Sequence, residues 1–303
     1  MKTHGGVSRK LAVSGTLALL SALPGLAAAG TPINKLTASS PTGQVEISNT
    51  AGSVSVTGWD RNEVAVTGEL GKGTEGLEFT KSGDVIRIKV IVPDHSYHTD
   101  ETDLVVKMPV GGSVAVNAVS ADVKIDGVRG AQRLQAVSGD VRTDGAGEDV
   151  ECRTVSGDVF VNGSGRKGVI TITTVSGDAS VERVAGELNA NTVSGNVTLG
   201  AGETSRSRLR STSGDLNMSG QLLPDARIDA ETISGDVRLD LTGSANGDFD
   251  VSTFNGEIRN CFGPKPTRTS EYAPGRELRF HDGTGSSRVR IKTLNGDISV
   301  CRK

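Results

Sequence analysis

Apolar and polar residues alternate along most of this chain, and the alternation is organised around one short phrase. The phrase, most often Val-Ser-Gly-Asp, occurs nine times, with one to three residues replaced in six of the copies. Four residues before its central Ser or Asn, and three residues after it, the side chain is apolar in every copy. Alternation at period two on both sides of a Gly-containing phrase predicts strand, turn and strand. The central residues of the nine copies are Ser120, Ser138, Ser156, Ser176, Ser194, Ser213, Ser234, Asn255 and Asn295.

The spacing of the phrases predicts a solenoid. Successive central residues are 18, 18, 20, 18, 19, 21, 21 and 40 residues apart, and a period of this size is typical of stacked repeats. One unit cannot bury its apolar side alone, so copies stack and pair their backbones. We therefore predict an all-β fold, a single-stranded β-helix or β-solenoid with about 18–21 residues per rung. A hexapeptide β-helix is excluded because it needs an apolar residue at every sixth position.

The first segment, residues 1–29, has the pattern of a secretory signal peptide. Lys2, Arg9 and Lys10 precede a short apolar run and the small residues Ala27-Ala28-Ala29. Its removal would lower the net charge from −3 to −6, since three cations and no acids leave. No later stretch is apolar enough to span a bilayer, so we predict an exported protein, periplasmic, cell-surface or secreted, with no transmembrane segment in the mature chain. A mildly acidic chain with 3% aromatic residues is a poor candidate for binding nucleic acid.

The rest of the chain is predicted to form two regions. Residues 30–110 are expected to be an N-terminal β region of degenerate rungs, because Gly52-Ser53-Val54 and Ser82-Gly83-Asp84 resemble the later phrase. Residues 111–303 are expected to be the β-solenoid proper, with an inserted loop at 262–274 where Pro and Gly are frequent. Terminal repeats of a solenoid are usually atypical because they cap the stack.

Two of the three cysteines occupy the same place in two repeats. Cys261 and Cys301 each lie five residues after the Gly of their phrase. Stacked rungs bring equivalent residues to about 5 Å, which is close to the Cα separation that a disulfide needs. We therefore predict a Cys261–Cys301 disulfide. Cys152 occupies a position that is apolar in every other copy and is expected to be a buried thiol, not a nucleophile.

The acidic residue of the phrase would form a column in the stack, and this column is the first candidate metal site. Stacked carboxylates repel each other, and a cation such as Ca²⁺ could offset the repulsion. The alternative is that each carboxylate accepts hydrogen bonds from the backbone of its own turn. Asn196 and Glu257 occupy the same column, which favours the turn interpretation, so no cofactor is predicted. The weak candidates for a cation are Asp122, Asp140, Asp158 and Asp178.

Other candidate sites have simpler interpretations. His95 and His98 lie among acidic residues and could bind zinc, but the segment lacks a strand pattern and is expected to be a connecting loop. His281 is expected in a strand without a nearby partner, and Trp59 is expected to cap the core or to form an exposed platform. Ser and Asp occur throughout because the repeat uses them, so their presence does not indicate a catalytic triad. We predict no catalytic residues and no enzymatic activity.

The repeated Val-Ser-Gly-Asp-Val, together with Val56-Thr57-Gly58-Trp59-Asp60 and Ile258-Arg259-Asn260-Cys261-Phe262-Gly263-Pro264, resembles the bacterial putative-adhesin β-strand-repeat family, a domain of unknown function. The resemblance covers roughly residues 40–300. It implies a β-solenoid on an exported or envelope protein and supplies no catalytic motif.

The leading hypothesis is a non-enzymatic exported scaffold or adhesin-like interaction protein of the cell envelope. Its long faces would present Lys124, Arg142, Arg238 and Arg259 to an unknown envelope protein or polysaccharide. The alternatives are a polysaccharide-acting β-helix enzyme and an envelope-stress protein that binds a peptide or lipid. A groove across several rungs, lined by charged residues outside the repeated columns, would favour the enzyme.

Overall fold

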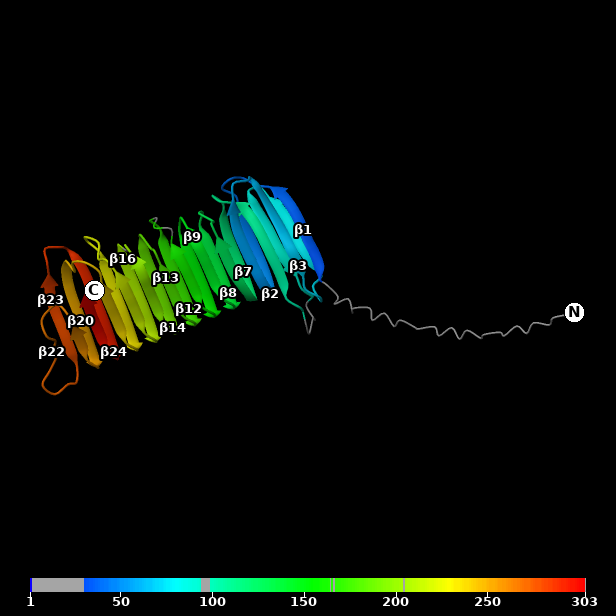
Figure 1. Cartoon of the computed structure of the whole chain (residues 1–303). Coiled ribbons are helices and arrows are strands. Elements are labelled where there is room, and N and C mark those ends of the chain that lie inside the picture. The colour runs from blue at the N-terminus through cyan, green and yellow to red at the C-terminus, as the bar shows by residue number, and fades with distance from the viewer. Residues whose placement is uncertain (2–29, 94–98, 164, 166, 204, 303) are drawn as a thin grey trace.

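The computed structural model describes Met1 and residues 30–93, 99–163, 165, 167–203 and 205–302. The predicted signal peptide, apart from Met1, lies outside these residues. The described residues form an elongated stack of strands without a helix (Figure 1), and most neighbouring strands are parallel. The predicted β-solenoid is therefore confirmed. None of the described residues forms a helical segment with the length and hydrophobicity that crossing a bilayer requires.

Each rung contributes one strand to each of two walls. The first wall holds the strands that lead into the repeated phrase. In spatial order these are β7 (Ser113–Asp126), β8 (Gln132–Ser138), β10 (Val150–Ser156), β12 (Val169–Ser176), β14 (Glu187–Ser194), β16 (Arg206–Ser213), β18 (Arg227–Ser234), β24 (Ser287–Asn295) and β20 (Gly247–Asn255).

The second wall holds the strands that leave the phrase. After the far half of β7 these are β9 (Val141–Ala146), β11 (Val159–Gly163), β13 (Ala179–Glu182), β15 (Val197–Gly202), β17 (Leu216–Gly220), β19 (Val237–Leu241), β25 (Ile298–Arg302) and β21 (Ile258–Asn260).

The core lies between the walls and is built from the predicted apolar positions. Because strand side chains alternate, the positions four before and three after the central residue both face inward. Ile172, for example, stacks between Cys152 and Ala190, and all three are 0% exposed. On the other wall, Val159 and Ala179 stack in the same way and are each 1% exposed. Every rung thus buries its apolar residues against its neighbours.

The order of rungs at the C-terminal end does not follow the sequence. A simple stack would place β20 next to β18, but β24 pairs with both β18 and β20. The last rung along the chain, β24 and β25, is therefore inserted between two earlier rungs, and the red strands lie between orange and yellow ones in Figure 1. The 40 residues between Asn255 and Asn295 therefore connect two adjacent rungs in the reverse of the sequence order.

The N-terminal end shows a similar exchange. The long strand β2 (Gln44–Trp59) lies between β7 on one side and β5 (Val85–Ile91) and β6 (Thr102–Pro109) on the other. Gly52 stands in register with Ala121, so it does occupy the repeated phrase's column. Ser82-Gly83-Asp84, in contrast, is the turn of an antiparallel hairpin between β4 (Gly76–Ser82) and β5, and the expectation that it forms a rung is wrong.

Antiparallel strands cover both ends of the stack. At the N-terminal end β4 covers β5, and β3 (Glu63–Leu70) followed by β1 (Thr31–Ala38) covers β6. At the C-terminal end β23 (Arg276–Asp282), itself paired with β22 (Thr267–Arg268), covers β20. An uncovered parallel edge would present unpaired backbone groups to other chains. These strands supply hydrogen-bonding partners to β5, β6 and β20, whereas β21 in the second wall pairs only with β25 among the described strands.

Two further features fix the C-terminal end. The disulfide between Cys261 and Cys301 is present, with a Cα–Cα separation of 4.8 Å, and it ties the outer strand β21 to the inserted strand β25. Phe249, Phe262 and Phe280 pack together with ring centroids 4.7–5.8 Å apart. Aromatic pairs at this distance add to the area that they bury, so this cluster closes the core at that end.

Candidate functional site

The repeated phrase forms one straight corner along the stack, which we call the Gly corner. Its Gly residues are required because the backbone of each rung approaches the backbone of the preceding rung closely. A side chain on Gly177 would overlap the carbonyl oxygen of Gly157, and one on Gly235 would overlap that of Gly214. Only a residue without a Cβ allows this approach. The Gly in the phrase is therefore structural.

The acidic column of the Gly corner is a hydrogen-bond ladder between rungs. Each column residue donates its backbone N–H to the side-chain Oδ1 of the column residue in the preceding rung, at 2.7–3.0 Å. The expectation that each carboxylate caps its own turn is therefore wrong, because the acceptor serves the neighbouring rung. The ladder runs through Asp122, Asp140, Asp158, Asp178, Asn196, Asp215, Asp236, Asp297 and Glu257.

The ladder explains its own exceptions. The amide oxygen of Asn196 accepts a hydrogen bond from the N–H of Asp215. An uncharged side chain can therefore serve as the acceptor at this position. Glu257 comes last in space, where it donates to Asp297 and its longer side chain is free to pair with Arg276. In the described part of the chain, no group of three or more His, Cys, Asp or Glu is arranged to hold a metal ion.

Small hydroxyl residues line the inner side of the Gly corner. Ser211, Thr232, Thr293 and Thr253 donate to the carbonyl oxygen of the neighbouring corner Gly at 2.9–3.2 Å. The hydroxyls of Thr154, Thr174 and Thr192 are buried without a hydrogen-bond partner. The inner hydroxyl therefore bonds to the corner in the C-terminal rungs but not in these three.

An apolar column runs along the outside of the first wall, immediately before the Gly corner. Its side chains stack on one another yet stay 45–50% exposed. With rungs about 4.8 Å apart, the nine positions extend over roughly 40 Å. The column comprises Val119, Val137, Val155, Val175, Val193, Thr212, Ile233, Leu294 and Phe254. The repeated phrase includes these residues, but their exposure to solvent was not predicted.

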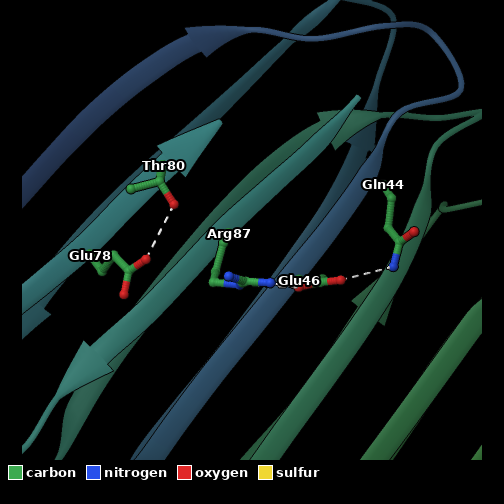
Figure 2. Close-up of polar contacts among 5 residues, drawn as sticks. All are labelled: Gln44, Glu46, Glu78, Thr80 and Arg87. Carbon is green, nitrogen blue, oxygen red and sulfur yellow. Dashed lines mark hydrogen bonds and ion pairs between the residues drawn. The ribbon is translucent and has the colours of Figure 1, made fainter. Parts of the chain in front are cut away.

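One ion pair and two side-chain hydrogen bonds lie close together near the N-terminal end of the stack. Arg87 on β5 contacts Glu46 on β2, with Nη2 and Oε2 3.0 Å apart, and Gln44 donates to the same carboxylate at 3.3 Å (Figure 2). In the same region Glu78 accepts a hydrogen bond from Thr80 (Figure 2). Only the Arg87–Glu46 ion pair joins two strands, while the two hydrogen bonds are each made within one strand.

Of the four cations that the sequence offers as partner contacts, three have contacts within the chain. Lys124 lies 3.0 Å from Asp126, and Arg238 lies 3.0 Å from Asp240. Arg142 stacks on the ring of Phe160, 4.3 Å from its centroid. Arg259 is exposed. The four lie on the second wall, so they do not combine into one surface with the apolar column.

The corner opposite the Gly corner carries a cleft of about 620 Å³ that crosses several rungs. Charged residues outside the repeated columns line it, namely Asp144, Arg183 and Glu203. Arg183 has φ 52°, lies 3.8 Å from Asp144 and donates to Asn162 at 2.7 Å. A groove of the kind that would favour an enzyme is thus present, although Arg183 already binds one of its two carboxylates.

The repeat geometry has a counterpart in a known family model, which matches residues 29–208 and again 185–301. The chain belongs to the Toastrack DUF4097 family. The resemblance identified from the repeated phrase is thereby confirmed at the level of the family. A search of curated proteins found no match for this Toastrack chain.

Solved structures of similar shape have low sequence identity to this Toastrack chain. A putative adhesin from Parabacteroides distasonis is 11% identical, with 89% of this chain and 98% of that chain covered and a TM-score of 0.48. A putative lipid binding protein from the same species is also 11% identical, with 90% and 97% covered and a TM-score of 0.35. A putative adhesin from Bacteroides fragilis is 8% identical, with 89% and 96% covered and a TM-score of 0.33. All three TM-scores are below 0.5, so no function is inferred from these structures.

The other candidate residues that the structure of this Toastrack chain describes lie in separate places and do not form a common site. His95 and His98 lie outside the described residues. His281 does have a partner, since its Nδ1 lies 2.8 Å from Asp248, and this hydrogen bond raises the pKa of the exposed imidazole. Trp59 donates its indole N–H to the carbonyl of Glu63 at 2.8 Å. Burial raises the pKa of the Cys152 thiol to about 12, which makes it an unreactive core residue.

Proposed function

We propose that this protein is an exported, non-enzymatic β-solenoid scaffold of the bacterial cell envelope that binds an envelope partner through the outward face of its first wall. The apolar column is the observation that supports this proposal. The stack needs apolar side chains inside, but Thr212 fills the outward position with no change in strand register. Continuous exposed apolar surface on a monomer typically marks an interaction site.

The proposal also agrees with the role of the repeated residues. Gly, Asp and the inward apolar positions each have a structural task within or between rungs. Among the repeated positions, the apolar column keeps about half of each side chain exposed to solvent. Because packing within the stack does not account for this exposed apolar surface, contact with a partner is the role we assign to it.

Co-sedimentation with isolated bacterial envelopes tests the proposal. The triple variant Val155→Thr, Val175→Thr and Val193→Thr copies the side chain that Thr212 already places in the column. We expect it to unfold like the unmodified chain and to bind envelopes several-fold more weakly, because the partner loses apolar contact. Val105→Thr, which changes a 40% exposed Val on β6, is the matched control. Equal binding by both variants, or none by the unmodified chain, would reject the proposal.

The cleft supports a second candidate function, a polysaccharide-acting enzyme. Its volume suits a small-molecule or sugar site, and the carboxylates of Asp144 and Glu203 line it. The two residues belong to rungs three apart, about 14 Å by the strand spacing, so glycoside hydrolysis would need their side chains to converge to about 5–9.5 Å. Turnover of a purified envelope polysaccharide, lost in both Asp144→Asn and Glu203→Gln, would favour this function over the scaffold. Absence of turnover across such polymers would remove it.

A further inference from the structure

A cluster of cations covers the outward face of the first wall on β16, β18 and β24, and we call it the basic patch. It has seven cations and two acids, an excess of five positive charges, on a chain whose net charge is −3. The cations are Arg206, Arg208, Arg210, Arg227, Arg288, Arg290 and Lys292, and the acids are Asp229 and Glu231.

The exchange of rungs at the C-terminal end creates this patch. In sequence order, β20 would follow β18 and would bring Asp248 and Asp250 beside it. The inserted β24 takes that place and aligns Arg288 with Arg227, which itself aligns with Arg206. Three arginines therefore stand side by side in one column. Asp248 and Asp250 instead border the patch on the outer side of β24, in register with Arg288 and Arg290. Residues some 80 positions apart in the sequence form one surface only because of this order.

The fold itself does not require these cations. The position of Arg206, Arg227 and Arg288 is occupied by Val169 on β12 and by Glu187 on β14, in the same register. Adjacent like charges repel and oppose stacking. The cations are therefore an addition to the scaffold and not part of its framework.

The patch is only partly neutralised by the chain. Arg206 lies 3.5 Å from Glu187, Arg210 lies 3.5 Å from Glu231, and Arg290 lies 3.7 Å from Asp250. In the described part of the chain, the other four cations have no acidic partner within 4.0 Å, and all are exposed. These four are Arg208, Arg227, Arg288 and Lys292. A cavity of about 230 Å³ lies within the patch, where Arg208, Arg210, Arg290 and Lys292 line it together with Asp229 and Glu231.

We propose that the basic patch binds an acidic polysaccharide, a deepening that rests on the proposed envelope function. Arginine binds carboxylate and sulfate groups through paired N–H donors, and the sheet spaces its cations at about 4.8 Å across strands and about 6.7 Å along them. An acidic polymer that lies across three rungs would meet several cations at once. The patch has no aromatic side chain, which disfavours single-stranded nucleic acid, because bases stack on aromatics.

A lipid surface fits this face less well. Membrane-bound surfaces sink apolar side chains into the acyl boundary. Here the neighbouring apolar residues Thr212, Ile233 and Leu294 are short, while the arginine and lysine side chains beside them are longer. The cations would hold a bilayer away from the apolar column.

Calorimetric titration of the full chain with heparin and with polygalacturonate tests the proposal, with neutral dextran as the blank polymer. We expect salt-sensitive binding of both acidic polymers and none of dextran. The double variant Arg208→Glu and Arg288→Glu, which breaks no ion pair, should weaken binding by about tenfold or more. Lys89→Glu with Arg259→Glu, an equal change of charge at two exposed sites away from the patch, should change it by roughly twofold or less.

The other outcomes are decisive as well. Equal weakening in both double variants would overturn the proposal, because net charge and not the patch would then set the affinity. Patch-dependent binding of phosphatidylglycerol vesicles or single-stranded DNA, without binding of either acidic polysaccharide, would overturn it in favour of those ligands. If envelopes still bind the Arg208→Glu, Arg288→Glu chain normally, this proposal fails while the proposed function stands.

Discussion

From β8 to β14, the outward face of the first wall is largely uncharged or internally paired, whereas from β16 to β24 it carries the basic patch. In the N-terminal half, Arg133 and Arg153 both contact Glu151, at 2.9 and 2.5 Å. In the C-terminal half, Arg227 and Arg288 stand in register. Among the described residues neither has an acidic oxygen within 4.0 Å, since Asp248, which is in register with Arg288, binds His281 instead. Both halves keep the same Gly corner and the same strand register. The Gly corner therefore determines how the rungs stack, while the charge of the outward residues varies without changing the stacking.

Loss of the disulfide should have the largest effect on stability, and only the C-terminal half contains it. Replacing Cys261 and Cys301 by Ser removes the closure of a 40-residue separation, which is worth about 4 kcal/mol in the chain-entropy model. Urea unfolding of the oxidised chain and the variant measures this. Reducing agent should lower the stability of the unmodified chain and leave the variant unchanged. A variant as stable as the oxidised chain would show that the bond does not hold the inserted rung.

Adding a methyl group at the Gly corner should damage either half to a similar extent. Gly177→Ala and Gly235→Ala would each force a Cβ against the carbonyl oxygen of the neighbouring Gly, at a cost of about 2–3 kcal/mol. Gly200→Ala is the control, since its new Cβ would make only ordinary contacts of 3.4 Å or more. Thermal unfolding compares the three variants. If the corner variants match the control, the shared geometry does not depend on glycine.

Breaking one step of the acidic ladder should have a smaller effect. Asp178→Ala removes the acceptor for the N–H of Asn196 and should cost about 1 kcal/mol. Asp178→Asn should be nearly neutral, because the amide oxygen of Asn196 already accepts the equivalent hydrogen bond, from the N–H of Asp215. Chemical denaturation of both variants gives the comparison. A large loss in Asp178→Asn would mean that charge, and not hydrogen bonding, is what the column supplies.

The smallest effects should distinguish paired from unpaired cations. Arg87→Ala breaks an exposed ion pair with Glu46 and should destabilise the chain by about 0.5 kcal/mol or less. Arg288→Ala removes a cation that stands beside Arg227 and should leave stability unchanged or slightly raised, because repulsion is relieved. Precise denaturation curves at low salt measure both. Destabilisation by Arg288→Ala equal to that by Arg87→Ala would mean that the patch has a structural role.

The sequence is sufficient to predict the repeat, the inward columns and the disulfide, because each follows from local alternation and a fixed period. It does not predict the rung order at the two ends, since periodicity says that rungs stack but not which rungs are neighbours. The basic patch depends on that order, as Arg288 reaches Arg227 only through the inserted strand. The outward direction of Val155 follows from the same alternation, because Cys152 and Thr154 on its strand face inward, but its apolar character alone does not indicate an exposed position.

Labelling of arginine side chains with phenylglyoxal, with and without heparin, compares the two halves of the wall most directly. Mass spectrometry then reports each arginine separately in one sample. The account predicts that heparin protects Arg208, Arg227 and Arg288, while Arg87 and Arg133 react equally in both conditions. Protection spread evenly over both groups, or confined to the N-terminal arginines, would contradict the claim that surface chemistry distinguishes two halves of one uniform scaffold.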